Sequence, residues 1–440
     1  MNADNAAYET IEEACVRRVN LKMDKNDAKG YYSYASGDDW TIPDTAEDGS
    51  SNRDVYSGFT LVDGNILPQV AIRENGKWVG INETGMRAVK SELLKGHGVT
   101  IAFYADQSLP GDEIRKDGYM NTSTWAQHTD DDMQCNHAVC IVGWDDSYPR
   151  ENFKEGHLPE GDGAWIVKNS WGSETEYATR EDGMPIGKNA WGIRNGEGLG
   201  TGYFYLSYYD RNITAPESMT FDVDLMQVGK VMNVFAYDYM PELFTKDGIN
   251  YLVQDVNILR TANVFTNTTD REVTVRAVST KTANPRARVE YAMYRLKEDA
   301  RNPEDGEYLG KRMAFCDYAG FHRESLLSGD ITLQPGERIA VIVTENVTDS
   351  DGVKKYEFSA NQAYSKALSE MVGGALYGIA VVNRGESFVY RDGQWTDWVD
   401  CEKVAEPTGP NDESSDELIS TDNFSSKLYV VADAGTDTEN

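Results

Sequence analysis

Strand-like runs bounded by turn residues recur throughout residues 211–401, and no long helical pattern interrupts them. In the run 288–296, Val289, Tyr291 and Met293 alternate with polar or amphipathic neighbours, which places the three on one face of a strand. Turn dipeptides such as Pro335-Gly336 separate the runs. This pattern of short alternating runs separated by turns predicts an antiparallel β-sandwich. The other apolar runs of this region are 231–237, 272–278, 338–344 and 377–383.

The first 210 residues have a different organisation, which predicts an α+β domain. Apolar residues at helical spacing predict helices at 8–24 and 83–95, with glycines after the second one to end it. Between and after them, long polar segments alternate with short runs rich in β-branched and aromatic residues. The predicted strands of this part are 99–105, 138–144, 164–169 and 202–209.

The end of the chain differs again. Residues 400–422 are acidic and rich in Ser and Pro, as in a linker, whereas 427–433 reads as one more strand that could return to the sandwich. A chain of 440 residues has room for two or three domains. We therefore expect a domain at 1–210, a sandwich at 211–401, and an acidic linker with the last strand of the sandwich at 402–440.

The charge of the chain disfavours some classes of binding partner, and its cysteine content disfavours some kinds of structural site. Asp and Glu number 73 against 42 Lys and Arg, and this excess of negative charge disfavours nucleic acid and anionic membranes as partners. The five cysteines are widely spread without a CxxC pair, which argues against a disulfide scaffold and a zinc ribbon. No export signal and no long apolar span are apparent. A cytosolic protein and a chain that begins downstream of its signal both fit this pattern.

The most informative stretch runs from Cys135 to Tyr209. It contains NHAVCIVGWDD at 136–146 and KNSWG at 168–172. His137 opens one predicted strand and Asn169 ends a neighbouring one, so the amide could orient the imidazole while Trp171 shields their hydrogen bond. A cysteine nucleophile needs such an imidazole, because the reactive species is the thiolate.

These two blocks, followed by WG at 191–192 and GYFYLSYYD at 202–210, resemble the papain family of cysteine peptidases. The resemblance implies the C-terminal, β-rich half of a papain-like fold, with His137 as the catalytic histidine, Asn169 as the orienting asparagine and Trp171 as the shield. The long insertions resemble a bacterial branch in which a lectin-like β-sandwich follows the peptidase domain.

The nucleophile block of that family, a Cys followed by Trp, is not found. Cys15 follows two glutamates, which would raise a thiol pKa, and it has no Trp after it. The positions of Cys135 and Cys140 beside and within an apolar run predict structural roles, as buried or edge residues. Two accounts fit: the sequence begins downstream of the nucleophile helix, or the chain is an inactive relative. In both, we expect the chain alone to show little or no activity.

The resemblance predicts peptide-bond hydrolysis without a cofactor, on a protein or peptide substrate, in a protein located outside the cell or at its surface. The alternative is a noncatalytic pseudopeptidase whose sandwich binds a surface glycan or protein. A zinc site from Cys135, His137 and the aspartates 130–132 is the weaker interpretation of the same stretch. Trp395 and Trp398 could stack on sugar rings, although sandwich tryptophans more often lie in the core.

Overall fold

The computed structural model describes residues 60–106, 118–171, 191–222, 230–238, 245–253, 259–326, 331–348, 350–363, 382–391, 393–401 and 421–433. Two compact units are present: the first contains 66–219, and the second contains 59–65 and the chain from 220 onward. The predicted helix at 8–24, Cys15, and most of the predicted strand at 377–383 lie outside the described residues.

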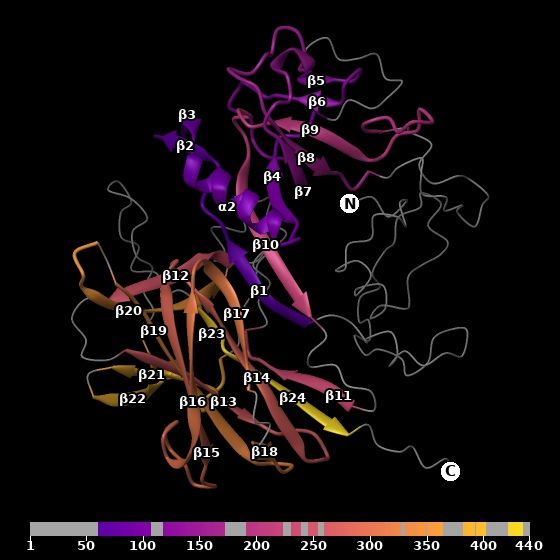
Figure 1. The fold of residues 1–440 in the computed structure, drawn as a ribbon. Coiled ribbons are helices and arrows are strands. Elements are labelled where there is room, and N and C mark those ends of the chain that lie inside the picture. The colour runs from indigo at the N-terminus through magenta and orange to yellow at the C-terminus, as the bar shows by residue number, and fades with distance from the viewer. Residues whose placement is uncertain are drawn as a thin grey trace, which may run out of the picture. The chain divides into compact units, whose positions relative to one another are not determined.

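The first unit is built on one sheet whose strands are mostly antiparallel, and β7, β8 and β9 lie side by side within it (Figure 1). A separate two-stranded hairpin precedes this sheet in the chain. The strands predicted from apolar runs are confirmed. In spatial order the sheet contains β10 (Thr214–Asp222), β4 (Val99–Phe103), β7 (His137–Asp145), β8 (Ala164–Lys168), β9 (Tyr203–Ser207), β6 (Ala126–Gln127) and β5 (Met120–Asn121), and the hairpin is β2 (Ala71–Glu74) with β3 (Lys77–Ile81).

Helix α2 (Glu83–Leu94) confirms the predicted helix at 83–95. It begins where the side chain of Asn82 accepts a hydrogen bond from the backbone N–H of Thr84, and it ends before Gly96, which has a positive φ. The helix also buries a carboxylate. Burial opposes ionisation of Glu92, but hydrogen bonds from His97, Lys95 and Ser218 outweigh this effect and lower its pKa.

The second unit is a sandwich of two antiparallel sheets (Figure 1). Strand β1, which precedes the described part of the first unit in the chain, pairs in this sandwich, and so does β24 near the C-terminus. One sheet contains β11 (Lys230–Phe235), β24 (Lys427–Asp433), β14 (Val273–Thr282), β17 (Ala319–Ser325) and β1 (Thr60–Ile66), with β18 (Thr332–Leu333) beside β14. The other contains β12 (Thr245–Val253), β20 (Lys354–Ala363), β19 (Arg338–Thr348), β13 (Arg260–Thr266), β21 (Ser387–Arg391) and β22 (Gln394–Asp397), with β15 (Ala287–Leu296), β16 (Gly306–Cys316) and β23 (Thr421–Phe424) attached.

The sandwich core lies between these two sheets. Val289, Tyr291 and Met293 of β15 are all at most 2% exposed, and they pack in one cluster with residues of β14 and β24 such as Val275 and Val430. Their polar neighbours along β15 face away from this core. The alternation read from the sequence is confirmed, because each strand must bury one face to stabilise the sheet pair.

Candidate active site

The pairing of β7 with β8 brings the predicted site residues together. Cys140 lies opposite Lys168 in this antiparallel pair. In an antiparallel pair, the residue numbers of opposite partners have a constant sum. This register, continued past the end of β8, places residue 169 beside 139 and Trp171 beside His137. The backbone N–H of Asn169 still bonds to the carbonyl of Gly202 on the β9 side, so the extension stays within the sheet.

His137 and Asn169 make a direct side-chain hydrogen bond. The imidazole Nε2 lies 2.8 Å from Oδ1 of Asn169. The same oxygen accepts the backbone N–H of Ser170 at 2.7 Å, so the oxygen end of the amide faces the ring. An amide oxygen only accepts hydrogen bonds, and Nε2 must therefore carry the proton. In the neutral ring this leaves Nδ1 unprotonated and available as a base.

Trp171 stacks on the imidazole. The two ring centroids lie 5.0 Å apart with an interplanar angle of 23°, and Asn169 is only 7% exposed. Behind them, Trp191 meets the edge of Trp171 and also packs on Phe204. This aromatic wall limits the access of water to the His137–Asn169 bond and so strengthens it, because a hydrogen bond is stronger in a low dielectric.

The sequence did not identify the contribution of Asn136, which lies immediately before His137. Its side-chain oxygen accepts the backbone N–H of Ala105 at 2.7 Å, and its side-chain N–H donates to the carbonyl of the same residue at 3.2 Å. These two bonds extend the β4–β7 pairing beyond the last ladder pair, Phe103 with His137. The only signal in the sequence was an Asn before a strand, which ordinarily indicates a turn.

The two described cysteines of this unit are poor nucleophiles. The thiol of Cys135 donates to the carbonyl of Asn212 at 3.1 Å, and burial raises its pKa. Cys140 packs against Gly98, where a Cβ would clash with its sulfur, and burial raises its pKa as well. A raised pKa lowers the thiolate fraction at neutral pH. The structural role predicted for both cysteines therefore agrees with their surroundings.

The side chains of the zinc alternative have separate partners. The thiol of Cys135 bonds to Asn212, and the imidazole of His137 bonds to Asn169. Asp130 and Asp131 accept hydrogen bonds from His157 and Tyr119, respectively. Within the described residues, no group of three His, Cys, Asp or Glu side chains is arranged to hold a metal. The zinc interpretation of 130–137 is therefore not supported.

The two tryptophans of the sandwich have different surroundings. Trp398 is 4% exposed and packs with Leu259, Phe358 and Phe424, so the core position expected of a sandwich tryptophan is confirmed and the alternative of sugar stacking is wrong for it. It directs its indole N–H to the carbonyl of Asp422, and a buried indole needs such a partner. Trp395 is half-buried and lines a pocket.

Comparison with known proteins finds one matching family model in each unit. Residues 69–179 match the model of the papain family cysteine proteases, and residues 248–408 match the lectin-like domain model. No curated protein matches the chain. In the described part of the chain, no helix has the length and apolar character that crossing a membrane requires.

Two solved structures share the fold. The clostridial cysteine protease Cwp84 after propeptide cleavage is 20% identical, with a TM-score of 0.57, and the alignment covers 89% of this chain and 74% of that one. The second structure contains the protease and lectin-like domains of Cwp84 from Clostridium difficile, a protein described as surface-layer associated. It is also 20% identical, with a TM-score of 0.55. The alignment covers 89% of this chain and 66% of that one, just under two thirds. The α+β class, with a papain-like segment followed by a β-sandwich, is confirmed. Residues 69–179 are therefore similar to the papain family of cysteine proteases, and residues 248–408 are similar to lectin-like domains.

Proposed function

We propose that the first unit supplies the histidine and asparagine of a papain-like cysteine peptidase site. The observation that carries the proposal is the 2.8 Å bond between Nε2 of His137 and Oδ1 of Asn169, covered by Trp171. It leaves Nδ1 of His137 as the base. The match to papain family cysteine proteases supports the same chemistry.

In the proposed reaction, Nδ1 of His137 takes the proton of a cysteine thiol, and the resulting thiolate attacks the peptide carbonyl. The C–N bond then breaks while the imidazolium gives its proton to the leaving amine. Water hydrolyses the thioester, again with His137 as the base, which restores the thiol. Asn169 keeps the ring in orientation throughout and exchanges no proton. The surroundings of Cys135 and Cys140 suit neither for this role, so the proposal places the thiol outside the described residues.

The second candidate is a noncatalytic module in which the sandwich binds a carbohydrate or a protein. The match of residues 248–408 to the lectin-like domain model favours it. The two candidates are compatible in one protein, since they use different units. Because Cwp84 is described as surface-layer associated, we also propose an extracellular or cell-surface location.

Asn169→Ala tests the peptidase proposal in a form of the protein that contains the nucleophilic thiol. We expect kcat to fall on the order of 10- to 100-fold with a smaller change in KM, because a misoriented base affects the transition state more than substrate binding. The measurement is the hydrolysis of a fluorogenic peptide.

Asn121→Ala is the matched control. Its side chain bonds to the carbonyl of Asn152, outside the His137 site, and it should leave kcat unchanged. Equal rates in the Asn169 variant and the parent protein would contradict the proposal. Failure of a thiol-reactive peptidyl probe to label the protein, together with measurable glycan binding, would favour the noncatalytic module.

A further inference from the structure

A pocket lies on the face of the second sandwich sheet that is turned away from the core. Val264 of β13 is next to Phe265 in sequence but packs on the opposite side of the strand, in a separate cluster with Ile342 and Phe388. Strands β13, β15, β19 and β21–β22, together with the loop at 300–302, line a volume of about 420 Å³ above this cluster. That volume falls within the range of small-molecule sites.

The floor of this pocket is apolar, and contacts on Trp395 orient its ring. Val264 and Phe388 are at most 8% exposed, and Leu296 and Trp395 complete the surface. The indole N–H of Trp395 donates to Glu304 at 2.9 Å, and the guanidinium of Arg260 lies 5.0 Å from the ring centroid. A ring fixed in this way loses little conformational freedom when a ligand binds.

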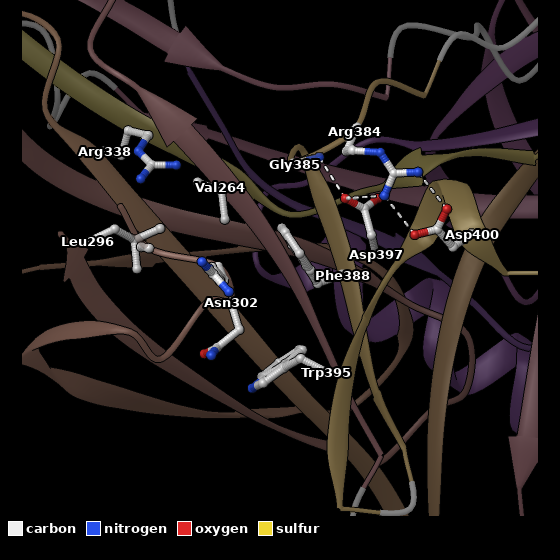
Figure 2. A pocket seen from close by; sticks show the side chains of 12 residues that line it. Val264, Leu296, Asn302, Arg338, Arg384, Gly385, Phe388, Trp395, Asp397 and Asp400 are labelled. Carbon is white, nitrogen blue, oxygen red and sulfur yellow. Dashed lines mark hydrogen bonds and ion pairs between the residues drawn. The ribbon is translucent and has the colours of Figure 1, made fainter. Parts of the chain in front are cut away.

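One wall carries both acceptors and donors. Arg384 makes two bonds to the carboxylate of Asp400, at 2.6 and 2.7 Å, and lies 4.0 Å from Asp397 (Figure 2). Asp397 also accepts the backbone N–H of Gly385 at 2.8 Å. The hydrogen bond from Arg384 lowers the pKa of Asp400, so this carboxylate remains an ionised acceptor. Such a wall suits a ligand with several hydroxyl groups.

The opposite wall is cationic. Figure 2 shows Arg338 across the pocket from the Arg384–Asp400 pair. One amino group of Arg338 is braced by the carbonyls of Lys297 and Glu298, at 2.7 and 2.9 Å. Across the described part of the chain, no carboxylate lies within ion-pair distance of Arg338. The other amino group of Arg338 is not used by these two carbonyls, and its N–H groups can donate a charge-assisted hydrogen bond to a carboxylate.

We propose that this pocket binds a sugar ring that carries a carboxylate. The ring would stack on Trp395, its hydroxyls would bond to Asp397 and Asp400, and its carboxylate would pair with Arg338. An acidic peptide fits less well, because its carboxylates would meet the two aspartates on the other wall. The proposal deepens the binding role proposed for the lectin-like unit, and it is independent of the peptidase site.

The test is calorimetric titration of the whole protein with methyl glucuronide and with methyl glucoside, which differ by the carboxylate. Arg338→Gln should weaken glucuronide binding at least tenfold and leave glucoside binding nearly unchanged. Trp395→Ala should weaken both at least tenfold, whereas Trp395→Phe, which keeps a ring in the floor, should retain most of the affinity. Arg271→Gln, at an arginine paired with Asp270 away from the pocket, is the control and should change neither titration.

Three results would overturn the proposal. One is the absence of saturable binding of either sugar. Another is glycan binding that persists in both Arg338→Gln and Trp395→Ala, which would keep the unit a glycan binder but place its site elsewhere. The third is tighter binding of a glutamate hexapeptide than of the glucuronide in competition. None of these results bears on peptide hydrolysis, so failure of this proposal and failure of the peptidase proposal are distinguishable.

Discussion

His137→Ala is expected to reduce kcat/KM for peptide hydrolysis by roughly 10³- to 10⁶-fold, in a form of the protein that contains the thiol. His137 has two roles in the proposed reaction: it removes the thiol proton and it protonates the leaving amine. Without the imidazole, the thiol stays protonated at neutral pH, and the amine must leave without receiving a proton, which makes it a poor leaving group. The measurement is the steady-state hydrolysis of a peptide substrate.

His97→Gln provides the control for this experiment. His97 lies just after α2 and bonds to Glu92 at 2.9 Å, so its replacement removes a histidine of the same unit without affecting the His137–Asn169 bond. It should leave kcat/KM within about twofold of the parent, since the side-chain amide of Gln can still donate to Glu92 and the change lies away from the His137–Asn169 bond. A His137→Ala variant that keeps a tenth or more of the parental activity would exclude His137 as the base.

Tyr291→Ala should lower the free energy of unfolding of the sandwich by about 3–5 kcal/mol, the usual cost of truncating a buried aromatic residue. Tyr291 is 0% exposed, and it packs between the sheets with Val289 and Met293. Removal of the ring leaves a cavity that the surrounding strands cannot fill without moving. Hydrogen exchange of the amides in β15 and β19 measures this effect within the sandwich itself, which suits a chain of two units.

Two variants control for this interpretation. Tyr291→Phe removes only the hydroxyl, whose bond to the carbonyl of His322 is long at 3.4 Å, and should cost about 1 kcal/mol or less. Tyr308→Ala removes a tyrosine that is 52% exposed on β16 and should have an effect within about 0.5 kcal/mol. If Tyr291→Ala exchanged as slowly as the parent, the ring would not be a core element.

Much of the fold followed from local patterns in the sequence. Apolar runs located the strands β4, β7, β8 and β9, and the alternation in β15 identified its buried face, because burial on one side imposes a period of two. The glycines after the apolar pattern at 83–95 marked the end of α2, since capping depends on neighbours in the chain. The predicted pair of His137 and Asn169 also rested on strand positions, and the structure places the two in contact.

The remaining features depend on contacts between distant residues. β1 pairs with β17, which lies far along the chain, and no local sequence pattern predicts which distant strand a given strand pairs with. Glu92 is fully buried on α2 although its residue type predicts exposure, because Lys95, His97 and Ser218 surround its carboxylate. The pocket beside Trp395 likewise combines several strands and turns, so composition could suggest an aromatic site but not the arginines around it.

The most direct test of the central claim is the tautomer of His137, read from nitrogen-15 chemical shifts and two-bond couplings of the imidazole at a pH where the ring is neutral. Because Oδ1 of Asn169 can only accept, we predict that the proton resides on Nε2 in the parent protein. In Asn169→Ala, the spectrum should shift toward a mixture of the two tautomers. A parent spectrum dominated by the Nδ1–H form, or one that Asn169→Ala leaves unchanged, would contradict the account.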